Sequence, residues 1–135
     1  MNTISFTDES FKQTDSYKNF INNNPDSSNL KIQASKANSA IPVSDVEVII
    51  SHIIDEYKVV FFNGKTNESG IIENIPLPVP KKDPNDLDIP LSTTYNIEAI
   101  YTKENIDILY KAKMFSGIDA IQNIDINPNI ESWEI

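Results

Sequence analysis

The sequence predicts an all-β fold, a seven-stranded antiparallel sandwich with an extended N-terminal arm. From Leu30 onward, apolar and polar residues alternate in short runs, as they do in strands that bury one face. Turn-forming residues separate these runs at short intervals, which is typical of sandwiches. The chain of 135 residues is long enough for one domain with a real core and too short for two comfortable ones.

The alternation is clearest in the first two runs. Leu30, Ile32 and Ala34 share one face of the first, and Val46 and Val48 share one face of the second. The third run is almost continuous in β-branched and aromatic residues, which favour strands, and the later runs alternate again. In order, the predicted strands cover residues 30–35, 45–48, 57–62, 71–75, 94–101, 108–114 and 123–127.

Proline and glycine mark the predicted turns. Pro42 indicates a loop before the second strand, because proline cannot donate to a central ladder. Gly70 can adopt a positive φ and indicates a turn before the fourth strand. The longest loop, residues 77–92, is expected to begin where three prolines stop regular pairing: Pro76, Pro78 and Pro80.

The domain organisation predicted is an arm over residues 1–27, the sandwich over 28–128 and a tail over 129–135. Asp15 and Ser16 are positioned to cap a short helix in the arm. Its aromatic face either packs as a turn on the domain or docks onto a neighbouring subunit. The candidate interaction residues are the aromatic side chains of the arm and tail: Phe6, Phe11, Tyr17, Phe20 and Trp133.

Composition excludes several classes of function. The net charge of −9, with dispersed lysines as the only cationic side chains, argues against nucleic acid as a partner. The chain has no cysteine, which excludes disulfides and thiolate metal sites. No apolar run is long enough to cross a membrane, and residues 1–10 lack the features of a signal peptide. We therefore expect synthesis in the cytoplasm without membrane insertion, and the Lys, Ile and Asn usage suggests a Gram-positive source.

Motifs that carry chemistry are scarce. His52 is the one histidine, with no nucleophile motif beside it, and three glycines form no phosphate-binding loop. The acidic loop has carboxylates suited to a hard cation but lacks the ligand pattern of an EF-hand, so a solvated loop is the preferred interpretation: Asp83, Asp86 and Asp88. The sequence thus predicts no catalytic residue, cofactor or metal.

Two stretches carry a family resemblance. Residues 40–48, Ala-Ile-Pro-Val-Ser-Asp-Val-Glu-Val, and residues 64–70, Gly-Lys-Thr-Asn-Glu-Ser-Gly, precede strands and resemble carboxypeptidase-regulatory-like or transthyretin-like domains of the Ig-like sandwich type. Residues 115–126 are similar to the closing strand of such domains in clostridial spore-associated proteins. The resemblance implies a structural or interaction role in a spore or surface assembly.

A second sandwich class, with Lys-Asn isopeptide crosslinks, is disfavoured. Lys31 lies on the face opposite Leu30 and Ile32, and the candidate asparagines, Asn123 and Asn127, face away from the core. A buried crosslink needs both partners on the apolar face.

Three functional hypotheses follow. The first is a non-catalytic structural protein that self-associates, or docks on other spore or surface proteins, through its arms. The second is a monomeric module that binds a glycan, peptidoglycan or protein through the 77–92 loop, with Tyr95 or Tyr101 near its end. The third, more remote, is an enzyme that uses His52 with acidic neighbours.

Overall fold

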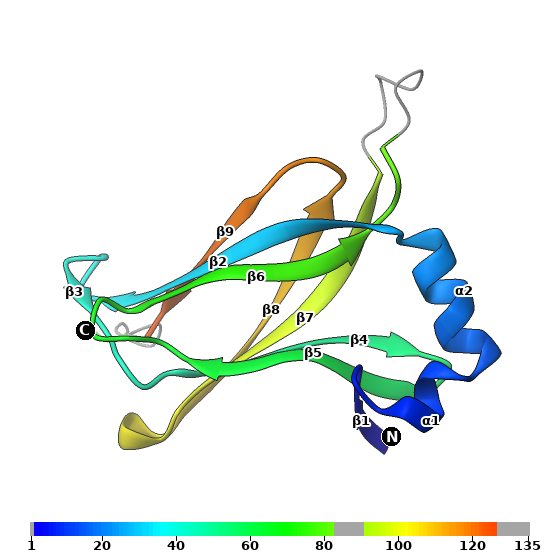
Figure 1. Cartoon of the computed structure of the whole chain (residues 1–135). Helices are drawn as coiled ribbons and strands as arrows, with labels where there is room; N and C mark the ends of the chain where they lie inside the picture. Colours follow the sequence, from blue (N-terminus) through cyan, green and yellow to red (C-terminus); the bar gives the residue numbers. More distant parts are fainter. Residues whose placement is uncertain (1, 83–90, 127–135) are drawn as a thin grey trace.

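The computed structural model describes residues 2–82 and 91–126, and it is an all-β sandwich of two sheets, as predicted (Figure 1). Two short helices lie in the N-terminal arm. The elements in order are β1 (Asn2–Ser5), α1 (Glu9–Lys12), α2 (Asp15–Asn23), β2 (Asp26–Lys36), β3 (Ile41–Pro42), β4 (Glu47–Ile54), β5 (Tyr57–Lys65), β6 (Ile71–Val79), β7 (Ser92–Tyr101), η1 (Thr102–Glu104), β8 (Ile106–Phe115) and β9 (Ala120–Asp125).

The larger sheet has the strand order β1-β5-β4-β7-β8, and the smaller one has β3-β2-β6 with β9 also paired to β2. The prediction of antiparallel pairing holds for most neighbours, but β1 runs parallel to β5 and β9 runs parallel to β2. All seven predicted strands are present, and the short strands β1 and β3 join them in the described part of the chain.

Strand β6 runs further than the sequence predicts. Its pairing with β2 continues through Pro76 opposite Asn29 and Pro78 opposite Ser27, up to Val79. Among the described residues β6 pairs with β2 alone, so it is an edge strand. An edge strand tolerates proline because the missing N–H falls on the side without a partner strand.

The core fills the space between the sheets, and strand alternation explains its composition. Tyr95 is the largest fully buried side chain, and its hydroxyl donates a hydrogen bond to the carbonyl of Pro78 in the opposite sheet. Because the core strands contribute every second residue, the buried positions of four strands follow one pattern: Leu30, Ile32 and Ala34; Val48 and Ile50; Ile75, Leu77 and Val79; Tyr95, Ile97 and Ala99.

The N-terminal arm packs on its own domain, at one end of the sandwich (Figure 1). The α2 helix forms as expected around Tyr17 and Phe20, but its N-cap is Thr14, whose Oγ1 accepts from the Tyr17 N–H at 3.2 Å. The Phe20 ring lies 5.0 Å from the His52 ring, between ring centroids. The arm therefore closes the end of the core with aromatic side chains.

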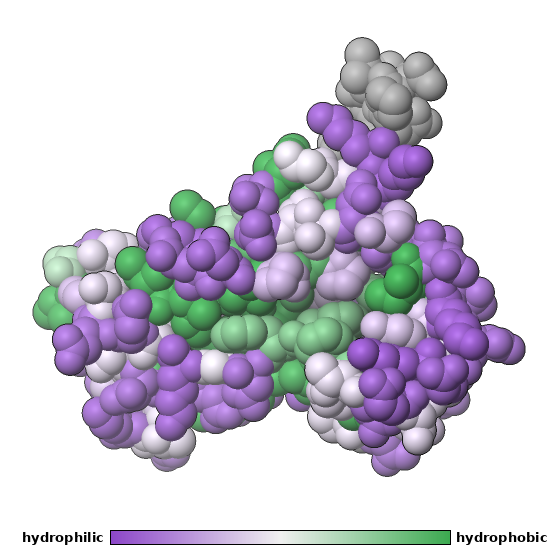
Figure 2. Space-filling view, in the orientation of Figure 1, coloured by the Kyte–Doolittle hydropathy of each residue, from purple (hydrophilic) through white to green (hydrophobic). Residues whose placement is uncertain are grey.

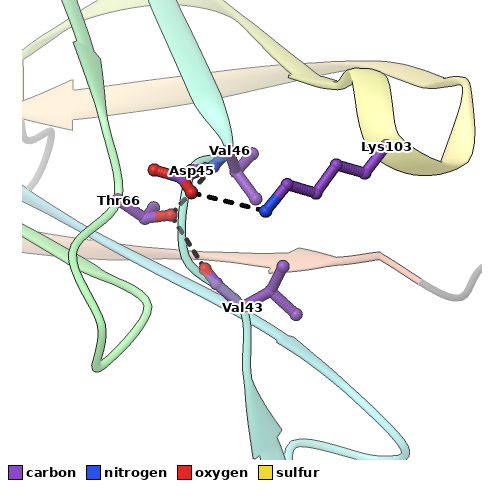
Figure 3. A network of polar contacts seen from close by, with 5 residues as sticks. All are labelled: Val43, Asp45, Val46, Thr66 and Lys103. Atoms are coloured by element: carbon purple, nitrogen blue, oxygen red, sulfur yellow. Dashed lines mark hydrogen bonds and ion pairs between the residues drawn. The ribbon is translucent and has the colours of Figure 1, made fainter.

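A polar network fixes the chain entering β4 (Figure 3). The buried Thr66 hydroxyl donates to the Val43 carbonyl at 2.8 Å and accepts from the Val46 N–H at 3.1 Å. Asp45 takes a positive φ of 62° between them, and its carboxylate lies 3.5 Å from the Lys103 ammonium. One threonine thus satisfies two backbone groups that the turn leaves outside the sheet.

No helix in the described residues is long and apolar enough to span a membrane.

Candidate functional site

The aromatic residues predicted for interaction lie mostly inside the molecule. Phe11 and Phe20 are buried, and Tyr17 packs edge-on against Phe11 with ring centroids 5.6 Å apart. Phe6 is 36% exposed and stacks on Phe61. Trp133 lies outside the described residues. The structure brings the four arm residues together around the end of the core, and a role in contacting partners stays a prediction.

The other residues considered from the sequence do not form a site. His52 lies within β4, and its Nδ1 is 2.8 Å from the Thr94 carbonyl oxygen. Lys31 faces out and pairs with Glu73 at 3.6 Å. Across residues 2–82 and 91–126 no three His, Cys, Asp or Glu side chains gather as metal ligands. The acidic loop carboxylates, Asp83, Asp86 and Asp88, lie outside the described residues, as does Asn127.

The best candidate site is a hollow of about 390 Å³ on the outer face of the larger sheet, called here the sheet hollow. Strand alternation directs the odd residues of β4 and the even residues of β7 away from the core. Ser51 is the small residue in the central strand β4, and longer side chains surround it, which leaves the depression. The lining residues are Ser51, Ile53, Lys58, Asn96, Glu98, Leu109, Tyr110 and Lys111.

A row of polar side chains crosses the sheet hollow. Ser51 pairs in register with Asn96, and Asn96 pairs with Lys111, so three neighbouring strands place them side by side. Ser51 is only 2% exposed, yet within the described chain its hydroxyl makes no hydrogen bond. The Asn96 amide and the Lys111 ammonium likewise have no side-chain partner there. Ser51 is the buried member of this row, whereas Asn96 is half-buried and Lys111 is exposed. A buried polar group without a partner is rare in folded proteins, so Ser51 indicates a place for a ligand.

An ion pair forms the other polar wall. The Lys58 ammonium, from β5, lies 3.7 Å from the Glu98 carboxylate, from β7, above the central strand. Burial raises the pKa of Glu98 above its ordinary value, because desolvation disfavours the charged form. The hydrogen bond and negative charge of Asp107 raise that pKa further, and Lys58 opposes the rise. Glu98 is therefore a carboxyl group suited to carry a proton nearer neutral pH than an ordinary glutamate.

We expect the pKa of Glu98 to respond in opposite directions to its two neighbours. Lys58→Met removes the attractive charge and should raise that pKa further, whereas Asp107→Asn removes the repulsive charge and should lower it. An NMR titration of the Glu98 side-chain carboxyl carbon measures both shifts. Lys65→Met, on the same strand as Lys58 but at its far end, is the control that should leave the pKa unchanged. Equal values in the wild type and the first two variants would contradict this electrostatic account.

The same raised pKa predicts a pH dependence of stability. Because the folded value lies above the unfolded one, the native state binds the proton more tightly. The stabilisation that comes from the protonated Glu98 is complete below the pKa of this residue in the unfolded chain. It is lost as the pH rises through the pKa of Glu98 in the folded protein.

A second hollow, of about 590 Å³, is larger but chemically poorer. It lies between the edges of β5 and β6, where Figure 2 shows a hydrophobic band between the two sheets. Its lining includes Phe6, Phe62, Ile75 and Pro76, and no carboxylate or ammonium group of the described residues lines it. We favour the sheet hollow because it combines an ionisable pair with unpartnered polar groups.

Sequence reasoning missed the sheet hollow. Most of the outward-facing residues in 94–101 and 108–114 are polar. Any sheet face exposed to solvent has this pattern, so it does not indicate a binding site. What creates the site is the adjacency of β4, β7 and β8, and the sequence does not give strand order.

Comparisons with known proteins find similar folds. No family model matches the chain, and no curated protein matches it. Among solved structures, the 5-hydroxyisourate hydrolase of Klebsiella pneumoniae is similar with a TM-score of 0.46 and 16% identity, over 73% of this chain and 90% of that one. An (S)-allantoin synthase is similar with a TM-score of 0.49 and 11% identity, over 74% of this chain and 41% of that one. The chain thus spans less than half of that synthase.

These matches correct one expectation and leave another without support. They agree with the transthyretin-like sandwich that the resemblance implied, and they give no support to a spore setting. Both matched proteins are named as enzymes, a finding that overturns the expectation of a non-catalytic assembly or binding protein. At this level of identity the likeness concerns the fold alone, so the chemistry of this chain has to be argued from its own residues.

Proposed function

We propose that the sheet hollow binds a small polar molecule and exchanges a proton with it through Glu98, the first requirement of acid–base catalysis. The observation that carries the proposal is the placement of the unpartnered row, Ser51, Asn96 and Lys111, beside the Lys58–Glu98 pair in one depression. A ligand in that depression is within reach of hydrogen-bonding groups and of an ionisable carboxyl at the same time.

The residues have distinct roles in this proposal. Ser51 and Asn96 offer a hydroxyl and an amide, which can each donate or accept, and they orient the ligand. Glu98 is only 23% exposed at its side chain, so a ligand that covers it removes more water and strengthens its electrostatic interactions. Lys58 stabilises the charged form of Glu98 after the proton leaves it.

The test joins NMR with calorimetry. A library of small polar compounds is screened against the labelled chain, and binding in the sheet hollow should shift the resonances of Ser51, Asn96 and Lys111. Titration calorimetry of each compound that binds, in two buffers with different ionisation enthalpies, reports whether protons are taken up or released. We expect a net proton change near the pKa of Glu98, and its loss in Glu98→Gln.

A matched variant separates proton exchange by Glu98 from a general charge effect. Glu47→Gln lies on the same face of the sheet, in β4, outside the sheet hollow, and should keep the proton change. Binding without any proton change in the wild type, or the same change in Glu98→Gln, would refute the role of Glu98. Compounds that bind only elsewhere would refute the site itself.

A further inference from the structure

We infer that the ligand of the sheet hollow is a small carboxylate with a compact apolar body, its anionic oxygens held by Lys111 and Asn96. The inference rests on the proposed function and goes beyond it by naming the chemical class of the ligand.

Charge is the first argument. The whole chain carries a net charge of −9, yet the sheet hollow is lined by two lysines and one glutamate. Lys58 is matched by Glu98 at 3.7 Å, which leaves the Lys111 ammonium without an ion-pair partner in the described residues. Asp107, which hydrogen-bonds Glu98, adds a second negative charge on the Glu98 side, so the charges around the sheet hollow balance as a whole. The preference for an anion is therefore local to Lys111, whose ammonium lies beside Asn96 on the neighbouring strand.

The hydrogen-bonding groups are the second argument. An ammonium has three donors and no acceptor, and a side-chain amide has two donors on its nitrogen. A carboxylate has two oxygens that only accept, so it fits a row of donors. The register places Asn96 directly between Ser51 and Lys111, so the two oxygens of one carboxylate can be shared among neighbouring groups. Hydrogen bonds with charged partners are stronger than neutral ones.

The rim and the size of the sheet hollow define the rest of the ligand. Leu109 is 73% exposed and Ile53 is 48% exposed, and both line the depression next to the polar row. An apolar group placed on them would be removed from water without displacing any hydrogen bond. A volume of about 390 Å³ is at the small end of the range for ligand pockets, which suits a single ring or a short chain.

The experiment compares three probes of similar size and different charge: benzoate, benzamide and benzylammonium. Binding of each is followed by NMR titration of the full chain, using the resonances of Ser51, Asn96 and Lys111. The variant Lys111→Met keeps the length of the side chain and removes its charge. Lys113→Met, two residues along the same face of β8 and outside the sheet hollow, is the matched control.

We expect benzoate to bind most tightly, with affinity reduced about tenfold in Lys111→Met and unchanged in Lys113→Met. Benzamide should bind more weakly than benzoate, and neither substitution should change its affinity. If benzamide binds as tightly as benzoate and Lys111→Met has no effect, the carboxylate inference is wrong while the site of the proposed function stands. Equal losses in the two lysine variants would also overturn the inference, because they indicate general attraction. If no probe or library compound shifts the three resonances, both proposals fail.

Discussion

Tyr95→Ala is expected to lower the free energy of unfolding by about 3 to 5 kcal/mol, the range for removing a large aromatic side chain from a core. Tyr95 is fully buried, and its ring lies 5.6 Å from both the His52 and Phe61 rings, between centroids. Its hydroxyl also joins the two sheets through the Pro78 carbonyl. Alanine would leave a cavity at the point where the helical arm, β7 and β6 meet.

Tyr95→Phe separates packing from hydrogen bonding at this position. Phenylalanine keeps the ring and removes the donor, so it should cost about 1 to 2 kcal/mol, including the buried Pro78 carbonyl left without its partner. Urea unfolding, monitored by far-UV circular dichroism, gives the free energy of unfolding of both variants. Equal losses for the two variants would show that the hydrogen bond, and not the packing of the ring, makes Tyr95 important.

Gly70→Ala is expected to cost about 3 kcal/mol, from positive-φ strain together with loss of local hydrogen bonding. Gly70 has a φ of 75°, and a Cβ there would stand 2.3 Å from the Ala34 carbonyl oxygen. The backbone would have to move to relieve this contact. The Ala34 N–H donates a hydrogen bond of 2.7 Å to the Gly70 carbonyl at the same place, so the movement would disturb this bond. The turn therefore needs glycine both for its conformation and for the close approach of β2.

Gly117→Ala is the matched control, because the backbone conformation is the same and the surroundings are open. Gly117 has a φ of 74°, but the nearest atom to an added Cβ is a side-chain carbon of Lys82 at 3.4 Å. We expect a loss of about 1 kcal/mol, from positive-φ strain alone. The same urea unfolding measures it. A loss as large as that of Gly70→Ala would mean that strain, and not the contact with Ala34, dominates at both positions.

The buried Ser51 is of interest because it is unfavourable for stability. A hydroxyl removed from water and left without a hydrogen bond costs free energy that an alanine at the same place would not. Ser51 lies beside Asn96 in the neighbouring strand, and no hydrogen bond joins their side chains in the described chain. Proteins retain such destabilising residues at functional sites. The buried hydroxyl of Ser51 therefore supports the proposals made for the sheet hollow.

The sequence by itself determined the local structure of this protein. Alternation such as that of Leu30, Ile32 and Ala34 predicted the strands and their buried faces, because side chains of a strand point to opposite sides with a period of two. The α2 helix was predicted from the spacing of its aromatic residues, with Asp15 and Ser16 as the capping residues in place of Thr14. These features depend on residues close together in the chain, so a single sequence contains them.

The tertiary structure decided everything that depends on which strands are neighbours. The parallel pairing of β9 with β2, and the edge position that lets β6 continue through Pro76 and Pro78, follow from strand order. The sheet hollow is of the same kind: Ser51, Asn96 and Lys111 form a row only because β4, β7 and β8 lie side by side in that register. A search for motifs along the chain found no chemistry, because cross-strand contacts between distant residues leave no fixed spacing in the sequence.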